Sequence, residues 1–181
     1  MILLETKLKD CYVIESKLFN DERGCFYEVF NQIKFNKIIG ADVNFVQDNE
    51  SFSFKGVLRG LHFQKGNHAQ AKLVRVSQGR VLDVVVDLRK SSRTFGEHLS
   101  IELNEENKKQ LFIPKGFAHG FVVLSKSAVF SYKSDNYYNK ESEGGIIFND
   151  SELNINWQLP EDELIISKKD MVLPELKTCK I

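Results

Sequence analysis

Cationic, imidazole and amide side chains gather in one short stretch of the chain, Gly56–Lys72, which reads GVLRGLHFQKGNHAQAK. It holds the cations Arg59 and Lys72, the histidines His62 and His68, and two glutamines. Fixed cations beside an imidazole suit an anionic substrate and a proton transfer. Hydrophobic strand patterns follow the stretch, so a fold is expected to hold these groups together. We therefore predict that it forms one side of an active site.

His62 has an apolar neighbour on each side, Leu61 and Phe63. In a strand both neighbours point to the face opposite His62. Taken alone, such a histidine is more often a core side chain bonded to a backbone carbonyl than a catalytic group. Arg59 and Lys72 shift the balance, because a buried imidazole near two cations is costly unless an anion or a carboxylate compensates. We therefore favour a functional role for His62.

The segment Pro114–His119 (PKGFAH) has the P-x-G-x-x-H pattern and resembles the second signature of the cupin superfamily. The first cupin signature supplies a glutamate and two histidines as metal ligands. Counting back from Gly79 puts Lys72 at the glutamate position, and Gly66 and His68 at the histidine positions. The remaining histidines are too few for a stable zinc or iron site, and an ammonium group repels a metal ion. We expect no metal.

Lys72 can do part of a metal's work, because a fixed ammonium stabilises an enolate oxygen. The alternative for Lys72 is a solvated surface lysine. Tyr132 shares a strand face with Phe130 and can donate a proton opposite a histidine, or simply pack. Tyr138 can stack on a nucleobase or serve as packing. Asp170 can hold the imidazole tautomer of His62 if the chain folds back, and is otherwise part of a polar turn.

The elements that must position these groups follow from hydrophobic patterning. Alternation of apolar and polar residues predicts strands at Lys72–Val76, Leu99–Leu103 and Ala128–Lys133. The nearly continuous apolar runs Val81–Leu88 and Gly120–Leu124 predict strands buried on both faces. Turn signals at a spacing of about ten residues are typical of an antiparallel sandwich or barrel. Helical pattern is limited to Glu28–Ile39 and a single turn at Glu105–Lys109, so we predict an all-β double-sheet domain with a few short helices.

Length and composition narrow the class of protein. A chain of 181 residues is predicted to form one domain, residues 1–181. Lys plus Arg (25) balances Asp plus Glu (25), so no overall charge attracts nucleic acid or an anionic membrane. The N-terminal segment becomes charged too early for a signal peptide, and no segment approaches a membrane-spanning length. Three separated cysteines without a CxxC motif fit reduced thiols, so we expect a cytoplasmic protein.

With these residues assembled, the chain resembles the dTDP-4-dehydrorhamnose 3,5-epimerase family from about Leu18 to about Leu176. Six segments in order carry the resemblance: DERGCFYE, FVQDNESFSFKGVLRGLHFQ, HAQAKLVRVSQGRVLDVVVDLR, ENKKQLFIPKGFAHGFVVLS, YKSDNYY and SKKDMVLPEL. The resemblance implies a cupin-like double-stranded β-helix, or jelly-roll barrel. It also implies an isomerase without a cofactor that epimerises C3 and C5 of dTDP-4-dehydro-6-deoxy-D-glucose. The product, dTDP-4-dehydro-L-rhamnose, leads to rhamnose for lipopolysaccharide or cell-wall polysaccharide.

The resemblance also assigns roles by position. In the family a histidine base removes the α-proton and a tyrosine reprotonates the carbon from the opposite face. His62 matches the base, Asp170 its orienting carboxylate, Tyr132 the acid, and Lys72 the residue facing the enolate. The other matched positions are substrate contacts, with Lys168 as a second choice for the lysine: Arg23, Arg59 and Lys169 around the diphosphate, Tyr138 against thymine, and Glu28, Gln47, Asp48, Asn49, His119 and Glu143.

Two positions depart from the expected family pattern. Gly144 stands where family members often carry arginine, and Lys65–Asn67 occupies a loop that often contains proline. The family is typically dimeric with exchanged N-terminal strands, so we expect a homodimer. Three other readings stay open: a single-carbon (C3 or C5) epimerase of another dTDP-4-keto-6-deoxy sugar, a non-catalytic sugar-nucleotide or metal-binding cupin, and a purely structural β-domain.

Overall fold

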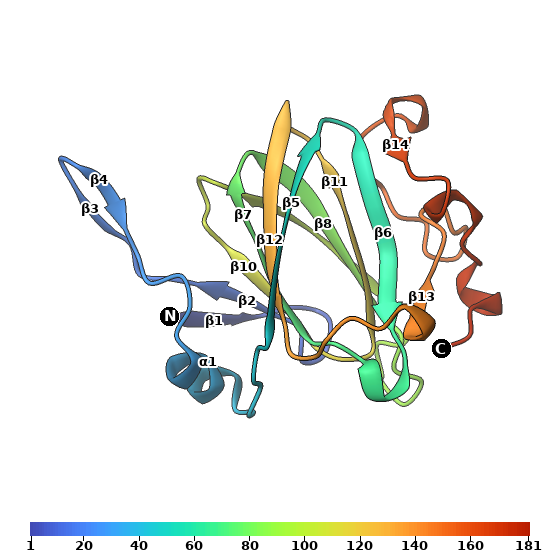
Figure 1. The fold of residues 1–181 in the computed structure, drawn as a ribbon, viewed down its shortest axis with the longest axis horizontal. Helices are drawn as coiled ribbons and strands as arrows, with labels where there is room; N and C mark the ends of the chain where they lie inside the picture. Colours follow the sequence, from blue (N-terminus) through green and yellow to red (C-terminus); the bar gives the residue numbers. More distant parts are fainter.

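Two facing β-sheets form the body of the protein in a computed structural model that describes residues 1–181 (Figure 1). The first sheet has six strands, and neighbouring strands within it run antiparallel. In spatial order these strands are β1 (Ile2–Glu5), β2 (Tyr12–Glu15), β10 (Gln110–Ile113), β7 (Lys72–Gln78), β12 (Ser127–Ser134) and β5 (Gln47–Phe54).

The second sheet is antiparallel except at its short last strand, β14 (Ile165–Ile166), which pairs parallel with β6 (Val57–Gln64). In spatial order the sheet consists of β13 (Glu143–Gly145), β6, β11 (Phe117–Val123), β8 (Arg80–Asp87) and β9 (His98–Asn104). Each strand segment predicted from the sequence falls on an observed strand, and the all-β double-sheet prediction is confirmed.

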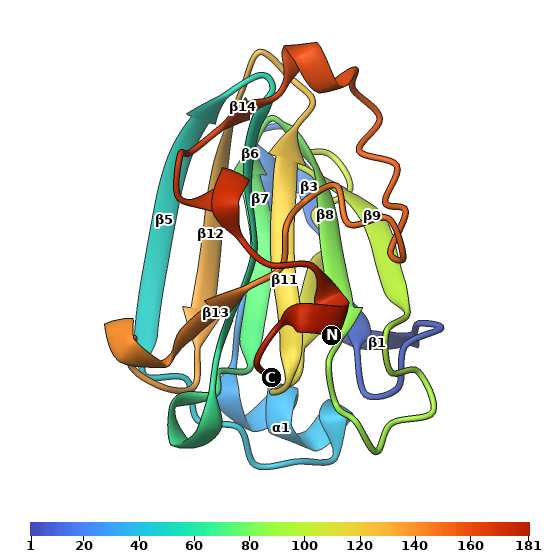
Figure 2. The same cartoon turned by 90° about the vertical axis from the view of Figure 1, so that its right-hand side faces the viewer.

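Apolar side chains fill the space between the sheets and also cover the outer face of the second sheet. The inner cluster includes Val74 and Phe130 from the first sheet and Val85 from the second. The outer cluster joins Leu61 of β6 to Trp157 of the C-terminal segment. Figure 2 shows this segment crossing the face of β6, β11 and β8. The second sheet is therefore buried on both faces, as its continuous apolar runs predicted.

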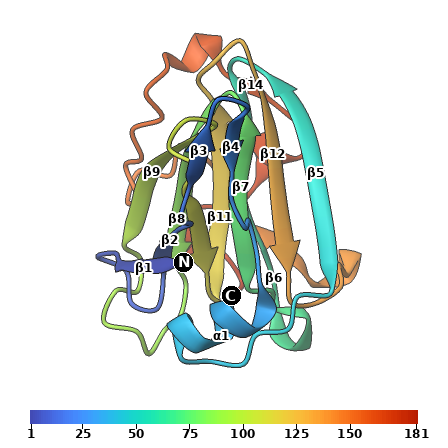
Figure 3. The ribbon, with the colours of Figure 1, turned by 90° about the vertical axis from the view of Figure 1, so that its left-hand side faces the viewer.

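One short helix, α1 (Gln32–Ile39), lies across the end of the first sheet (Figure 3). The prediction of a helix from Glu28 was wrong for its first residues, because the side chain of Asn31 accepts a hydrogen bond from the Lys34 N–H and starts the helix there. The helix ends at Gly40 in the left-handed region, with φ 67°. Phe35 packs on Phe112 of β10, with ring centroids 5.4 Å apart.

The single turn predicted at Glu105–Lys109 is present as a hydrogen-bonded turn, in which the N–H of Lys108 donates to the carbonyl of Asn104 at 3.2 Å, but it does not become a helix. The carboxamide oxygen of Asn104 accepts hydrogen bonds from the N–H groups of Glu106 and Asn107, at 3.0 and 2.6 Å. A short polar side chain bonded in this way stabilises a turn at the expense of a helix. The remaining single turns are 3-10 in type: η1 (Gly66–His68), η2 (Lys140–Ser142), η3 (Glu161–Glu163), η4 (Asp170–Val172) and η5 (Leu176–Thr178). None of the helices is long and apolar enough to cross a membrane.

A two-stranded hairpin extends away from the body before α1. Its strands are β3 (Phe19–Asp21) and β4 (Gly24–Phe26), and both are exposed along their whole length. Figure 1 shows the hairpin as an arm that projects away from the two sheets. Phe19 and Phe26 pack only loosely on each other, with ring centroids 6.4 Å apart. An isolated hairpin of this kind is marginally stable in water, so this one needs a surface to lie against.

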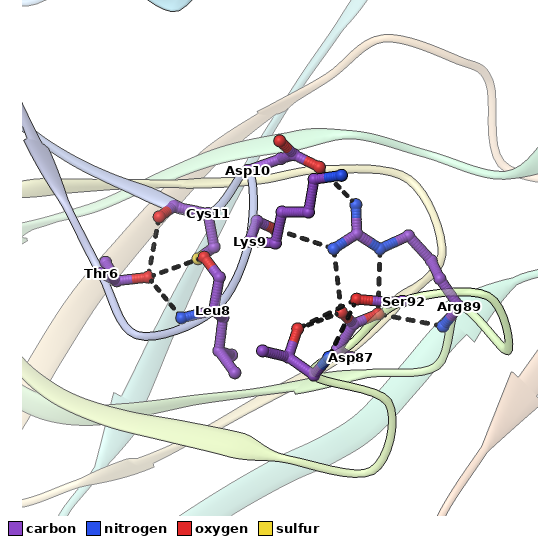
Figure 4. A network of polar contacts seen from close by, with 9 residues as sticks. Thr6, Leu8, Lys9, Asp10, Cys11, Asp87, Arg89 and Ser92 are labelled. Atoms are coloured by element: carbon purple, nitrogen blue, oxygen red, sulfur yellow. Dashed lines mark hydrogen bonds and ion pairs between the residues drawn. The ribbon is translucent and has the colours of Figure 1, made fainter.

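A buried ion pair fastens the N-terminal segment to the end of β8 (Figure 4). Asp87 has no exposed surface and accepts hydrogen bonds from Arg89 and, at 2.7 Å, from the hydroxyl of Thr94. Arg89 also donates to Asp10 and to the carbonyl of Lys9, each at 2.8 Å. Burial raises the pKa of Asp87, but the hydrogen bonds from Arg89 and its neighbours outweigh it and lower this pKa to about 2.

Replacing Arg89 with alanine is expected to destabilise the protein by about 3–5 kcal/mol, because it leaves the buried carboxylate of Asp87 without its partner. The deficit should shrink as the pH falls from about 4 to about 2, since the depressed pKa of Asp87 makes its contribution present above that window and lost below it. Urea unfolding curves at several pH values measure both effects. Arg93→Ala, at an exposed neighbouring arginine, is the matched control. Equal losses from the two substitutions would contradict the assignment.

Candidate active site

A cavity of about 650 Å³ opens between the two sheets at the end of the barrel near β14. It is lined by strands of both sheets and by the chain from Ile165 to Asp170. Eight of the site residues predicted from the sequence line it: Asn49, Arg59, His62, Lys72, His119, Tyr132, Lys169 and Asp170. The structure thus brings together residues that are far apart in the sequence and come from several different strands.

His62 projects from β6 into this cavity, while Leu61 and Phe63 are buried on the opposite face of the strand. The predicted parity is therefore confirmed. Its Nε2 lies 2.8 Å from Oδ1 of Asp170, a residue of the C-terminal segment. The backbone N–H of Gly60 donates to the other carboxylate oxygen at 3.3 Å. With Nε2–H turned to the carboxylate, Nδ1 is left as the free basic nitrogen.

Asp170 is ionised at neutral pH. Burial raises its pKa, but hydrogen bonds from His62, Gly60 and Ser167, together with the charge of the imidazole, outweigh burial and lower the pKa below its ordinary value. The side chain is only 5% exposed, which keeps water from competing for these bonds. An ionised, fixed carboxylate holds the imidazole ring in one orientation and fixes which of its nitrogens carries the proton.

Lys72 and Tyr132 face the same cavity from adjacent strands, β7 and β12. The Lys72 ammonium lies 5.6 Å from the centre of the Tyr132 ring. Lys72 keeps some surface toward the cavity, but its ammonium is enclosed by protein, so it is not a solvated surface lysine. Burial lowers its pKa to about 8, against the opposing charges of Asp83 and Glu143. Burial raises the pKa of Tyr132, so the phenol keeps its proton at neutral pH.

His119 lies beside His62, since the two residues are partners in the pairing of β11 with β6. Its Nε2 is 2.8 Å from Oδ2 of Asp83, which has no exposed surface. Its ring stacks on Phe130 with centroids 5.8 Å apart. Sequence reasoning missed Asp83, although a signal existed: an aspartate in the apolar run VLDVVVDL must be buried, and a buried carboxylate needs a partner.

Two predicted contacts, Tyr138 and Glu143, line a second hollow of about 670 Å³, which shares His62 and Lys169 with the cavity, and a third, Gln47, is bonded to Tyr138. The hydroxyl of Tyr138 donates to Glu143 at 3.0 Å, and the ammonium of Lys169 donates to the same oxygen at 2.6 Å. Gln47 accepts the backbone N–H of Tyr138 at 3.3 Å. The ring of Tyr138 is exposed and available for stacking. Lys168, the second choice, lines neither space.

The other three predicted contacts do not reach the cavity of their own chain. Arg23 is at the turn of the hairpin, 85% exposed and paired with Asp21 at 2.6 Å. Glu28 pairs with Lys34 at 2.8 Å. Asp48 pairs with Lys133 at 2.8 Å on the outer face of the first sheet. Glu28 and Asp48 line a different hollow, on the side of the sheet where the hairpin begins.

The glycine that departs from the family pattern has a local explanation. A β-carbon at Gly144 would come within 2.6 Å of the ring of Phe63, the neighbouring residue across the pair of strands β13 and β6. The aromatic ring thus occupies the space that a larger residue at this position would need. His68 belongs to η1 and lines neither the cavity nor the second hollow, so His62 and His119 are the histidines of the site.

Comparisons of the sequence and of the fold with known proteins agree on one family. The sequence model described as dTDP-4-dehydrorhamnose 3,5-epimerase matches residues 5–178. The enzyme of that name from Salmonella typhimurium is 53% identical over 179 residues, which cover 97% of this chain and 96% of the relative.

Two solved structures are similar over nearly the whole chain. The dTDP-4-dehydrorhamnose 3,5-epimerase of Elizabethkingia anophelis has a TM-score of 0.95 and 60% identity, covering 98% of this chain and 97% of its own. The dTDP-6-deoxy-D-glucose-3,5-epimerase of Legionella pneumophila, in complex with dTDP-4-keto-L-rhamnose, has a TM-score of 0.93 and 46% identity, covering 98% and 93%.

Proposed function

Because the chain belongs to the dTDP-4-dehydrorhamnose 3,5-epimerase family, we propose that its cavity carries out the family's reaction with His62 as the base and Tyr132 as the acid. The substrate is dTDP-4-dehydro-6-deoxy-D-glucose, and inversion at C3 and C5 gives dTDP-4-dehydro-L-rhamnose. The observation that carries the proposal is the 2.8 Å contact between His62 and Asp170 inside a cavity that Lys72 and Tyr132 also line.

The two proposed proton-transfer groups come from opposite sheets. His62 belongs to β6 of the second sheet and Tyr132 to β12 of the first, and both line the cavity between them. A sugar held there has one face toward the imidazole and the other toward the phenol. Removal of a proton on one side and its return on the other inverts the carbon. The same pair serves C3 and C5, because both carbons flank the C4 ketone.

Lys72 supplies the stabilisation that makes this chemistry accessible to a histidine. The α-proton of a ketone is too weakly acidic for imidazole unless the enolate is stabilised, and positioning, electrostatics and acid–base help together must lower the barrier by roughly 10 kcal/mol. An enclosed ammonium near the C4 oxygen acts in a low-dielectric site, where it is worth more than in water. This assigns to Lys72 the work that a metal ion does in other barrels of this kind.

The remaining residues fit the nucleotide end of the substrate. Arg59 and Lys169 bring positive charge to the edge of the cavity, which suits a diphosphate. Tyr138 presents an exposed ring that can stack on thymine. Gln47, Asn49 and Glu143 offer amide and carboxylate groups along the same path. We further propose that residues 1–181 act as one domain, because the C-terminal segment supplies Asp170 to β6.

The hairpin supports a homodimer. Its strands carry the exposed side chains Phe19 and Phe26, and β5 has an unpaired edge with Phe52 and Phe54 exposed beside it. A strand edge and an unsupported hairpin are complementary surfaces. We propose that the hairpin of each subunit lies against the other, so that Arg23 of the partner subunit completes the diphosphate contacts. Three free cysteines fit a reducing compartment, and we assign the enzyme to the cytoplasm.

Loss of the base and loss of the acid should have different isotopic signatures. In deuterium oxide, the wild-type enzyme should place label at both C3 and C5, whereas a single-carbon epimerase labels one position. His62→Ala should abolish exchange because no other group takes the proton. Tyr132→Phe should retain some exchange without normal product, because abstraction still occurs from the His62 side. Proton NMR of the sugar measures each position, and normal turnover by His62→Ala would sink the mechanism.

The exchange of Arg23 between subunits can be tested with two inactive variants. Arg23→Ala and His62→Ala homodimers, unfolded and refolded together, form hybrids in which one site has the wild-type His62 and receives Arg23 from the other chain. An equal mixture should recover about a quarter of the wild-type activity, because half of the dimers are hybrids with one intact site each. Each variant refolded alone is the control. If Arg23 served its own subunit, the mixture would recover no activity.

A further inference from the structure

Asp83 has an unusual environment for a fully buried carboxylate. Its Oδ2 contacts Nε2 of His119 at 2.8 Å, but its Oδ1 is buried without any hydrogen-bond partner in the protein. A buried carboxylate oxygen normally accepts hydrogen bonds, and one without them is stable only if a nearby positive charge compensates. The candidate charge is the ammonium of Lys72, which belongs to β7 of the facing sheet, lines the same cavity as His119 and interacts electrostatically with Asp83.

The second His–Asp pair of the cavity, His62 and Asp170, has no unpartnered carboxylate oxygen. Asp170 shares one oxygen with His62, and its second oxygen accepts the N–H of Gly60. Both oxygens of Asp170 are therefore occupied by the group that it orients and by the backbone. Asp83 uses one oxygen for His119 and leaves the other for a charge across the barrel. The two aspartates thus have different electrostatic roles although both bind a histidine.

Several charged or titratable groups face Lys72 from the elements packed around it. Two acidic side chains favour its ammonium form, with Asp83 of β8 the stronger and Glu143 of β13 the weaker. Glu143 is already bound to Lys169, so its charge is largely satisfied. The other groups on this side of the cavity are Tyr132 of β12, His119 of β11, His62 and Arg59 of β6, and the Lys169–Asp170 segment.

We propose that Asp83 is a positioning residue of the reaction, whose unpartnered oxygen holds the positive charge on Lys72 while its other oxygen holds the ring of His119. The proposal rests on the 3,5-epimerase activity assigned above. With the Nε2–H of His119 turned to Asp83, Nδ1 remains an acceptor for a hydroxyl of the sugar. One buried carboxylate then sets the ionisation of the group facing the enolate and the tautomer of its neighbour.

The expected consequence is a shift in the pH dependence of turnover. In the wild-type enzyme kcat/KM, whose pH dependence reports ionisations of the free enzyme, should fall on the alkaline side as Lys72 loses its proton, near its pKa of about 8. Asp83→Asn removes the charge but keeps the shape, so the pKa of Lys72 should fall and the alkaline limb should move down by about one pH unit. At pH 8 the protonated fraction of Lys72 then falls from about one half to about one tenth, so kcat/KM falls about fivefold with little change in KM.

Asp87→Asn is the matched control. Asp87 is equally buried, lies four residues further along the same strand, and pairs with Arg89 away from the cavity. It should lower the thermal stability without moving the alkaline limb. An Asp83→Asn enzyme whose limb stays in place, or an Asp87→Asn enzyme whose limb moves equally, would overturn the proposal, because Asp83 would then act only through the stability of the fold.

A second measurement reads Lys72 without turnover. Competitive acetylation of the lysines at a series of pH values, followed by peptide mass spectrometry, gives the protonation state of Lys72 directly. Its pKa should be lower in Asp83→Asn than in the wild type, and an unchanged value would contradict the proposal. Asp83→Ser removes the same charge if the asparagine variant fails to fold. Absence of activity in the wild type itself would instead refute the proposed function and leave the labelling result to decide the role of Asp83.

Discussion

The hydrogen bond between His62 and Asp170 joins two residues that are 108 positions apart in the sequence, and the arrangement of the cavity depends on it. For Asp170 to reach His62, the C-terminal segment must cross the outer face of the second sheet and return along β6, where β14 pairs in parallel. The apolar cluster around Trp157 and Leu61 holds that path. Packing on one face of β6 therefore positions the chemistry on the other face.

Burial of charge is the second constraint on the design. The barrel interior encloses two carboxylates, two imidazoles and an ammonium, each of which is costly to remove from water. Each of these carboxylates is bound to a histidine. Asp170 of the C-terminal segment contacts His62 of β6, and Asp83 of β8 contacts His119 of the neighbouring strand β11. Asp87 and Arg89 form a buried ion pair at the far end of β8, and neither residue lines the cavity.

Much of this organisation could be predicted from local sequence. Alternation around Leu61, His62 and Phe63 sets which side chain faces the cavity, because strand parity leaves no other choice. Contacts that depend on the rest of the chain could not be derived in the same way. The proximity of Asp170 to His62 depends on the path of the C-terminal segment, and no local pattern shows that Arg23 lies on an exposed hairpin outside the cavity of its own chain. Glu28 was predicted to be helical because the pattern continued through it, whereas the Asn31 cap decided where α1 begins.

In the proposed mechanism, the combination of Lys72 with Asp83 explains how a cation can serve an enolate without binding the ketone too tightly. A lone buried ammonium would be costly, and it would lose its proton or attract any anion that entered the cavity. Opposed by a carboxylate, it presents little net charge to the neutral ketone. When charge moves onto the C4 oxygen, the ammonium gains a second negative partner in addition to the carboxylate of Asp83. Stabilisation that arises only in the transition state raises turnover, whereas equal binding of ketone and enolate would not.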